Sequence, residues 1–158
     1  MLFGEQLREF LSAAEKHGVR FLLVGGGAVN FHGYQRLSAD VDLWIDHSPE
    51  NLERLRQALT ACGYEVDRWP DAVRSADQNV SIKLSPDLTL ELITRFDPGC
   101  SFDEAWERGE LGELADLPVV RYRVISYPDL VNSKLRAARP KDLLDVQELV
   151  RKRGAPGP

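Results

Sequence analysis

The fold of this chain is decided by two neighbouring stretches, FLLVGGGA at residues 21–28 and SADVDLWI at residues 38–45. The first is typical of an apolar strand followed by a glycine turn that opens a short helix. The second predicts a strand in which Asp40 and Asp42 share one face, because alternate residues of a strand point the same way. Two such carboxylates repel each other unless a positive group lies between them, and a divalent cation is the simplest candidate.

The glycine turn at residues 25–27 matches neither of two familiar phosphate-binding loops. A P-loop needs Gly-Lys-Ser/Thr after the glycines, whereas Ala28 and Val29 follow here. A dinucleotide fingerprint needs a sixth-position glycine, where this chain has Asn30. What remains is a tight turn from strand to helix whose N–H groups hold phosphate oxygens. The alternative is a turn that only requires positive φ angles.

A third carboxylate is expected from the strand predicted at residues 88–93. Glu91 interrupts this apolar run, and its charge is explained if that face of the strand meets the site. Asp87 is the alternative, but it lies in a Ser-Pro-Asp turn, which is typical of a structural role. Mg²⁺ or Mn²⁺ would take oxygen ligands from Asp40, Asp42 and the third carboxylate, and from substrate phosphates.

Basic and acidic residues alternate near the end of the chain. Lys134 and Arg139 are candidates to neutralise a triphosphate, whereas Arg136 is interpreted as part of a solvated helix face. Asp142 and Asp145 fall in the first turns of the last helix, where negative charge is favoured. They are interpreted either as caps or as groups that orient Arg139 or Lys134.

Hydrophobic spacing and turn signals predict the remaining elements. Helices are expected at residues 2–16, 26–32, 49–61, 127–138 and 140–153. Strands are expected at residues 19–24, 41–45, 64–69, 80–84, 88–93 and 119–125. This order predicts an α/β (α+β) fold, a mixed sheet flanked by helices with helices at the C-terminal end.

The bulk properties fit a single domain over residues 1–153 followed by a flexible tail at 154–158. The chain has 158 residues, 43% of them hydrophobic, which is enough to build a core. Its net charge of -5 argues against nonspecific nucleic-acid binding, so no DNA partner is expected. Cys62 and Cys100 form neither a metal pattern nor a disulfide framework, which favours a cytoplasmic protein. No apolar run approaches ~18 residues, so no membrane span is expected.

Three further residues have simple interpretations. Trp44 belongs to an apolar strand and is expected in the core. His32 and His47 show no metal-ligand spacing with another His or Cys, so both are expected to be polar surface residues.

Two blocks of the sequence resemble a known group of proteins. The glycine turn followed by D-x-D at residues 24–43 resembles the first motif of the nucleotidyltransferase superfamily, which has the DNA polymerase β-like fold. The run KLRAARPKDLLD at residues 134–145 is similar to the C-terminal signature of small bacterial AbiEii-like nucleotidyltransferases. The resemblance implies transfer of an NMP from an NTP with release of pyrophosphate, assisted by Mg²⁺ or Mn²⁺.

The resemblance also implies roles for particular residues. The catalytic, metal-binding carboxylates would be Asp40, Asp42 and Glu91. The nucleotide-binding residues would be Gly25, Gly26, Arg36, Ser38 and Lys134. Gly25 and Gly26 would contact phosphates, and Arg36 and Ser38 would brace the loop before the metal-binding strand.

Two hypotheses about function follow. In the first, the protein is a metal-dependent nucleotidyltransferase that acts on a hydroxyl of RNA, protein or a small molecule. Many proteins of the resembling group are toxin components of toxin–antitoxin or phage-defence pairs, so a cognate antitoxin is an expected partner. In the second, the same fold binds a nucleotide or a partner chain without catalysis.

Overall fold

The computed structural model describes residues 4–38, 40–115 and 119–157. The predicted helix start at Leu2, Ala39 of the second stretch and Pro158 of the tail lie outside the described residues. The helices are α1 (Glu5–Lys16), α2 (Gly25–Phe31), α3 (Pro49–Ala61), α4 (Asp71–Arg74), α5 (Phe102–Arg108), α6 (Tyr127–Ala137) and α7 (Pro140–Arg153). The strands are β1 (Phe21–Val24), β2 (Asp40–Ile45), β3 (Val80–Ser85), β4 (Leu88–Ile93), β5 (Glu110–Leu114) and β6 (Val120–Val124).

The strands form one mixed sheet in the order β3-β4-β2-β1-β6-β5. β1 pairs antiparallel with β2 and parallel with β6, and β2 pairs parallel with β4. This confirms the predicted fold class. The register places Asp42 opposite Val24 on one side and opposite Glu91 on the other. Three strands that are separate in sequence therefore contribute to one region of the sheet.

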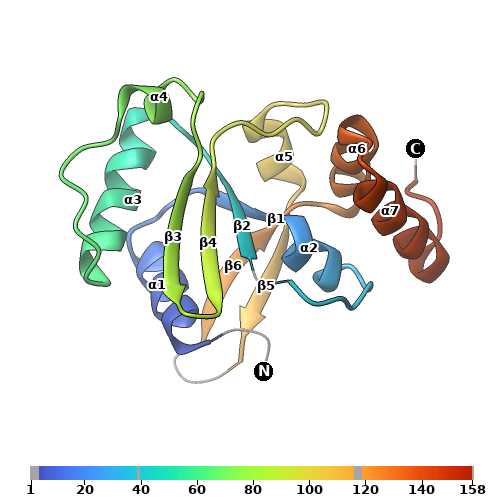
Figure 1. The fold of residues 1–158 in the computed structure, drawn as a ribbon, viewed down its shortest axis with the longest axis horizontal. Helices are drawn as coiled ribbons and strands as arrows, with labels where there is room; N and C mark the ends of the chain where they lie inside the picture. The colour runs from blue at the N-terminus through green and yellow to red at the C-terminus, as the bar shows by residue number, and fades with distance from the viewer. Residues whose placement is uncertain (1–3, 39, 116–118, 158) are drawn as a thin grey trace.

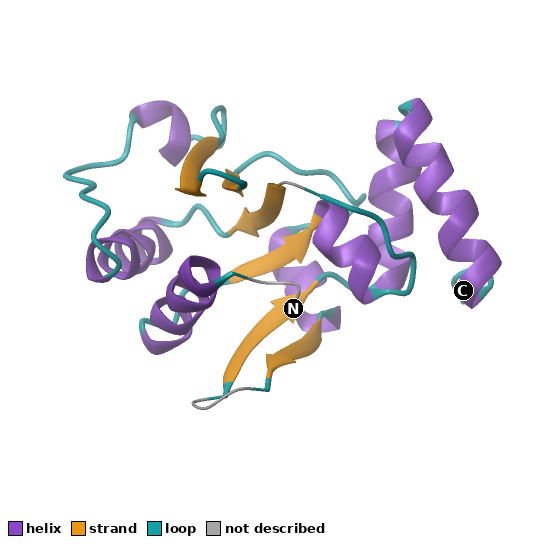
Figure 2. Cartoon of the chain, turned by 60° about the horizontal axis from the view of Figure 1, so that its bottom comes forward, coloured by secondary structure: helices purple, strands orange, loops and turns teal. Residues whose placement is uncertain are grey.

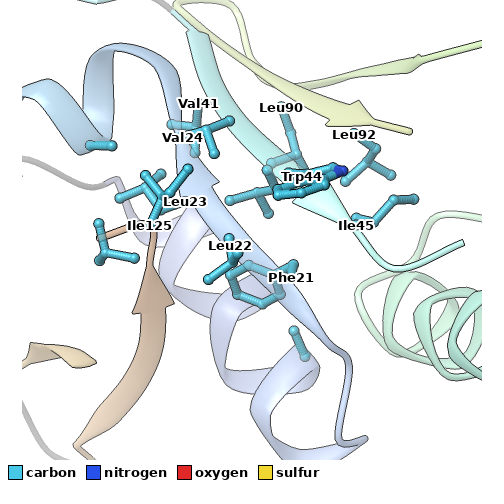
Figure 3. Packing of buried hydrophobic residues seen from close by; sticks show 14 of the residues in the cluster. Phe21, Leu22, Leu23, Val24, Val41, Trp44, Ile45, Leu90, Leu92 and Ile125 are labelled. Atoms are coloured by element: carbon cyan, nitrogen blue, oxygen red, sulfur yellow. The ribbon is translucent and has the colours of Figure 1, made fainter. Parts of the chain in front are cut away.

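The central strands carry the core (Figure 3). Trp44 is buried as predicted, together with Leu22 from β1 and Leu90 from β4. The Trp44 ring meets Phe102 of α5 edge-on, with 5.0 Å between ring centroids. Because alternate residues of β2 share a face, α5 covers the same face of the sheet that carries Asp40 and Asp42.

Two pairs of helices lie at opposite ends of the molecule. α1 packs against α3 and β6, and α6 packs against α7. Figures 1 and 2 show α6 and α7 side by side, apart from α1 and α3. None of the helices in the described ranges has both the length and the apolar character needed to cross a bilayer.

One predicted strand is absent, and three elements were not predicted. Residues 64–67 alternate between half-buried and exposed positions, as a strand would, but none of the described strands pairs with this segment. Instead, the Trp69 indole donates a hydrogen bond to the backbone of Leu52 at 2.7 Å, which anchors this segment to α3. The prediction of a strand here was wrong because alternation reports burial, not pairing. The missed elements are α4, α5 and β5.

His32 is buried, so its predicted place on the surface was wrong, whereas His47 is exposed as predicted. The His32 Nε2 donates to the carbonyl of Ile125 at 2.8 Å, and Nδ1 accepts from Arg153 at 2.6 Å. Burial lowers the pKa of His32, which favours the neutral ring that these two bonds require. The ring therefore fastens the end of α7 to the end of α2.

Candidate active site

The site is built around a close approach between Asp42 on β2 and Gly25, the first residue of α2. Gly25 has a φ of +60°, which residues with a Cβ adopt only with strain. A Cβ on Gly25 would also collide with the carboxylate of Asp42. Glycine is therefore required at position 25 for two reasons. The turn needs a positive φ there, and the Asp42 carboxylate occupies the space that a side chain would need.

Carboxylates gather around Asp42 without enough positive charge to balance them. Burial raises the pKa of Asp42, and the nearby charges of Asp40 and Glu91 raise it further. Lys134 and Lys141 only partly offset this rise. The register thus places the three carboxylates that the sequence nominated on one face of two neighbouring parallel strands.

Glu91 is tied to the sheet, because its Oε1 accepts a hydrogen bond from the hydroxyl of Ser81 on β3. Within the described residues, no three His, Cys, Asp or Glu side chains form a group that could hold a metal ion. Asp87 lies exposed in the turn between β3 and β4, as a structural turn residue would. The third metal ligand stays a prediction.

A cleft of about 430 Å³ opens beside Asp42, between the sheet and the α6–α7 pair. Gly25 and Lys134 line it as well, so three of the predicted site residues meet in one cleft. Its basic lining residues are Arg95, Lys134, Arg136 and Arg139, and its acidic ones are Asp42, Asp97 and Asp142. Arg136 is exposed, as expected of a solvated helix face, and it also borders the cleft and pairs with Asp97 at 2.8 Å.

Two carboxylates of α7 hold the cations of the cleft wall. Lys134 Nζ donates to Asp145 at 2.8 Å and to Asp142 at 3.4 Å. Arg139 donates two side-chain hydrogen bonds to Asp142, at 2.6 and 3.1 Å. Burial alone would raise the pKa of Asp142, but the bonds from Arg139 and the charge of Lys134 lower it instead. The hypothesis that these aspartates orient Lys134 and Arg139 agrees with this geometry.

Arg36 and Ser38 lie on the other side of the glycine turn. They border a second hollow of about 290 Å³ that also reaches Asp40. The Ser38 hydroxyl donates to the backbone oxygen of Asp40 at 2.8 Å, and both side chains crowd the α-carbon of Gly26. This geometry fits the bracing role implied by the resemblance. Neither side chain lines the first cleft.

The sequence analysis missed one wall of the cleft, which consists of Asn79, Arg95, Phe96 and Asp97. These residues flank the β3–β4 hairpin, just before β3 and just after β4. The signal was available, since polar residues directly after a central strand lie at the sheet edge where ligands bind. No motif in residues 95–112 marks this wall.

Comparison with known proteins is informative at the level of the family. A family model described as "Nucleotidyl transferase AbiEii toxin, Type IV TA system" matches residues 9–158, nearly the whole chain. Among curated proteins, none matches the chain in sequence. The resemblance that the two sequence blocks indicated is therefore confirmed.

The crowding at Gly25 predicts a large loss of stability on Gly25→Ala. Gly18 is a matched control, because its φ of +67° is similar but nothing lies within 4 Å of its added Cβ. Gly18→Ala should cost about 1 kcal/mol from backbone strain alone. Gly25→Ala should cost about 3 kcal/mol, because the new methyl group must also displace Asp42. Urea unfolding of both variants measures the difference, and equal losses would contradict the crowding.

The raised pKa of Asp42 predicts that Asp42→Asn stabilises the fold. A carboxylate whose pKa is higher in the folded state than in the unfolded state destabilises the fold when it is ionised. At neutral pH the variant should therefore gain about 0.5 kcal/mol, after allowance for screening by solvent. The gain should fade as the pH falls through the raised pKa of Asp42 in the folded state, and it should be absent below the ordinary value of 3.8.

Thermal unfolding of wild type and Asp42→Asn at several pH values measures this dependence. Asp67→Asn, an exposed loop substitution, provides the control and should change little at any pH. A neutral-pH loss of stability in Asp42→Asn would show that the Asp42 charge is balanced in the fold.

Proposed function

Because the chain belongs to the AbiEii nucleotidyl transferase family, we propose that it is an enzyme that transfers an NMP from an NTP to a hydroxyl acceptor. In this reaction the acceptor hydroxyl loses its proton and its oxygen attacks the α-phosphorus. The bond from that phosphorus to the β-phosphate oxygen breaks, and pyrophosphate leaves. One observation carries the proposal. The Asp42 carboxylate occupies the space beside Gly25, at the wall of a cleft that several basic side chains line.

A divalent cation, Mg²⁺ or Mn²⁺, fits the unbalanced charge at Asp42. Asp40 and Asp42 would hold it, and Glu91 would be the third ligand. Two carboxylates are enough when substrate phosphates complete the coordination, which is the usual way that proteins bind Mg²⁺ with a nucleotide. When bound, the ion would stabilise the charge that develops on the α-phosphate and on the leaving group.

The remaining cleft residues supply charge and shape for the nucleotide. Lys134 and Arg139 lie where they would offset the negative charge of a triphosphate, while their own aspartate partners fix their positions. Phe96 packs against Trp44 at 5.0 Å between ring centroids and offers an apolar wall. We assign the nucleotide to this cleft, with the phosphates toward Gly25 and the base toward Phe96.

The test is incubation of the protein with each α-labelled NTP, Mg²⁺ and total RNA or cell lysate. We expect a labelled product and stoichiometric pyrophosphate, and a rate at least about 10²-fold lower for Asp42→Asn. Asp67→Asn is the matched control and should keep the wild-type rate. Chelation of divalent ions should abolish labelling, and excess Mg²⁺ should restore it. Undiminished turnover in Asp42→Asn would contradict the assigned site.

A binding module without catalysis is the second candidate. It is favoured by the bond that ties Glu91 to Ser81 and by the lack of a three-ligand group among the described residues. Calorimetry with NTP separates the two functions. Tight binding that is independent of Mg²⁺ and releases no pyrophosphate would favour the module, whereas metal-dependent binding with release of pyrophosphate would favour the enzyme.

We further infer that the protein acts as the toxin of a type IV toxin–antitoxin pair, as its family description suggests. The acceptor would then be an RNA or a protein of the host cell. Induced expression of the wild type should stop growth, and expression of Asp42→Asn should not. Co-expression of the cognate antitoxin should restore growth. Equal toxicity of wild type and Asp42→Asn would show that the effect does not depend on nucleotidyl transfer.

A further inference from the structure

The last helix, α7, is docked largely through charged side chains. Its buried residues are Asp142, Asp145 and Leu149, so two of the three are carboxylates. Leu143 and Leu144 on the same helix are about half exposed. A helix docked by apolar packing would instead bury a continuous apolar stripe.

Asp145 binds two cations that come from distant parts of the sequence. Its Oδ1 accepts from Arg36 Nε at 2.9 Å, and its Oδ2 accepts from Arg36 Nη2 at 3.0 Å. The same Oδ2 accepts from Lys134 Nζ at 2.8 Å. The Asp145 side chain is only 3% exposed, so these three bonds satisfy a buried charge.

The two cations border different hollows beside the glycine turn. Lys134 lines the cleft, whereas the guanidinium of Arg36 is behind the turn, with Nη1 3.4 Å from the position of a Cβ on Gly26. Arg36 is also held by its backbone N–H, which donates to Asn30 of α2 at 3.0 Å. One carboxylate therefore fixes a cation in the cleft and the segment that supports the turn.

Stability alone is a weak explanation for this arrangement. Burying ions carries a desolvation cost that their attraction often fails to exceed, and apolar groups of similar volume frequently stabilise a fold as well or better. A bidentate arginine–carboxylate pair does, however, define position and orientation closely. The arrangement suits a requirement for fixed geometry at the cleft.

We propose that Asp145 is a positioning residue for nucleotide binding, which holds Lys134 and the Arg36 segment in register across the glycine turn. The inference rests on the proposed binding of nucleotide in the cleft. If Asp145 has this role, the cleft wall that faces the phosphates depends on the docking of α7. This helix is more than a hundred residues away in sequence from the glycine turn.

Asp145→Asn provides a test in which two explanations predict opposite signs. The substitution removes a negative charge beside the cleft, so a purely electrostatic effect would tighten the binding of a polyanion. Loss of positioning should instead weaken the binding of ATP or tripolyphosphate about tenfold, since the cations are no longer fixed. Glu148→Gln removes the same charge from the same helix. Glu148 pairs with Arg151 and with no other cation in the described part of the chain, so this variant should leave affinity unchanged.

A second readout does not need any bound nucleotide. Hydrogen exchange at residues 33–38 and reductive methylation of Lys134 should both increase in Asp145→Asn and not in Glu148→Gln. Arg36→Lys, which keeps the charge but loses the two-bond geometry, should show the same exchange and weakened binding. The double variant, Arg36→Lys with Asp145→Asn, should change exchange and binding little more than either single variant does.

These measurements separate the two proposals. A wild type that binds no nucleotide would overturn the proposed function and, with it, the binding role of Asp145, while the exchange data would still decide whether Asp145 orders the turn. Tighter or unchanged binding in Asp145→Asn, or unaltered exchange and methylation in that variant, would overturn the positioning role. Should Asp145→Asn fail to fold, Arg36→Lys decides by the same criteria.

Discussion

The Asp42 carboxylate occupies the space that a side chain on Gly25 would need, and this is the constraint on which the rest of the site depends. It requires a residue without a side chain at the end of β1 and an antiparallel neighbour that presents Asp42 opposite Val24. Asp40 lies nearby because it shares a face of β2 with Asp42, and Glu91 lies nearby because the pairing of β2 with β4 places it opposite Asp42. The resulting concentration of negative charge is a cost to the fold that a bound cation would remove.

The sequence was sufficient for the parts of the site that depend on local geometry. Period-two alternation placed Asp40 and Asp42 on one face, and the charge of Glu91 in an apolar strand marked the same face of β4. The wall formed by Arg95 and Asp97 was missed, since polar residues directly after β4 become relevant only once β4 is known to lie beside β2. The segment at 64–69 shows the converse, because a local pattern of alternation was present without a partner strand.

Long-range ion pairs were the least predictable feature. Asp142 and Asp145 were recognisable as acidic residues at the start of a helix, and they were considered as partners of Lys134 or Arg139. The ion pair between Arg36 and Asp145 joins residues that are 109 positions apart in the sequence, and no spacing in the sequence indicates it. It explains why α7, with little apolar surface to bury, nonetheless lies against the core.

The central claim is that a cation and a polyphosphate meet at Asp42 and Gly25. A crystal structure with Mn²⁺ and a nonhydrolysable NTP analogue tests this most directly, because the anomalous scattering of Mn²⁺ locates the ion independently of the rest of the map. The account predicts an anomalous peak in contact with the carboxylates of Asp40 and Asp42, with the triphosphate between Gly25 and Lys134. A peak elsewhere, or a nucleotide bound away from this cleft, would contradict it.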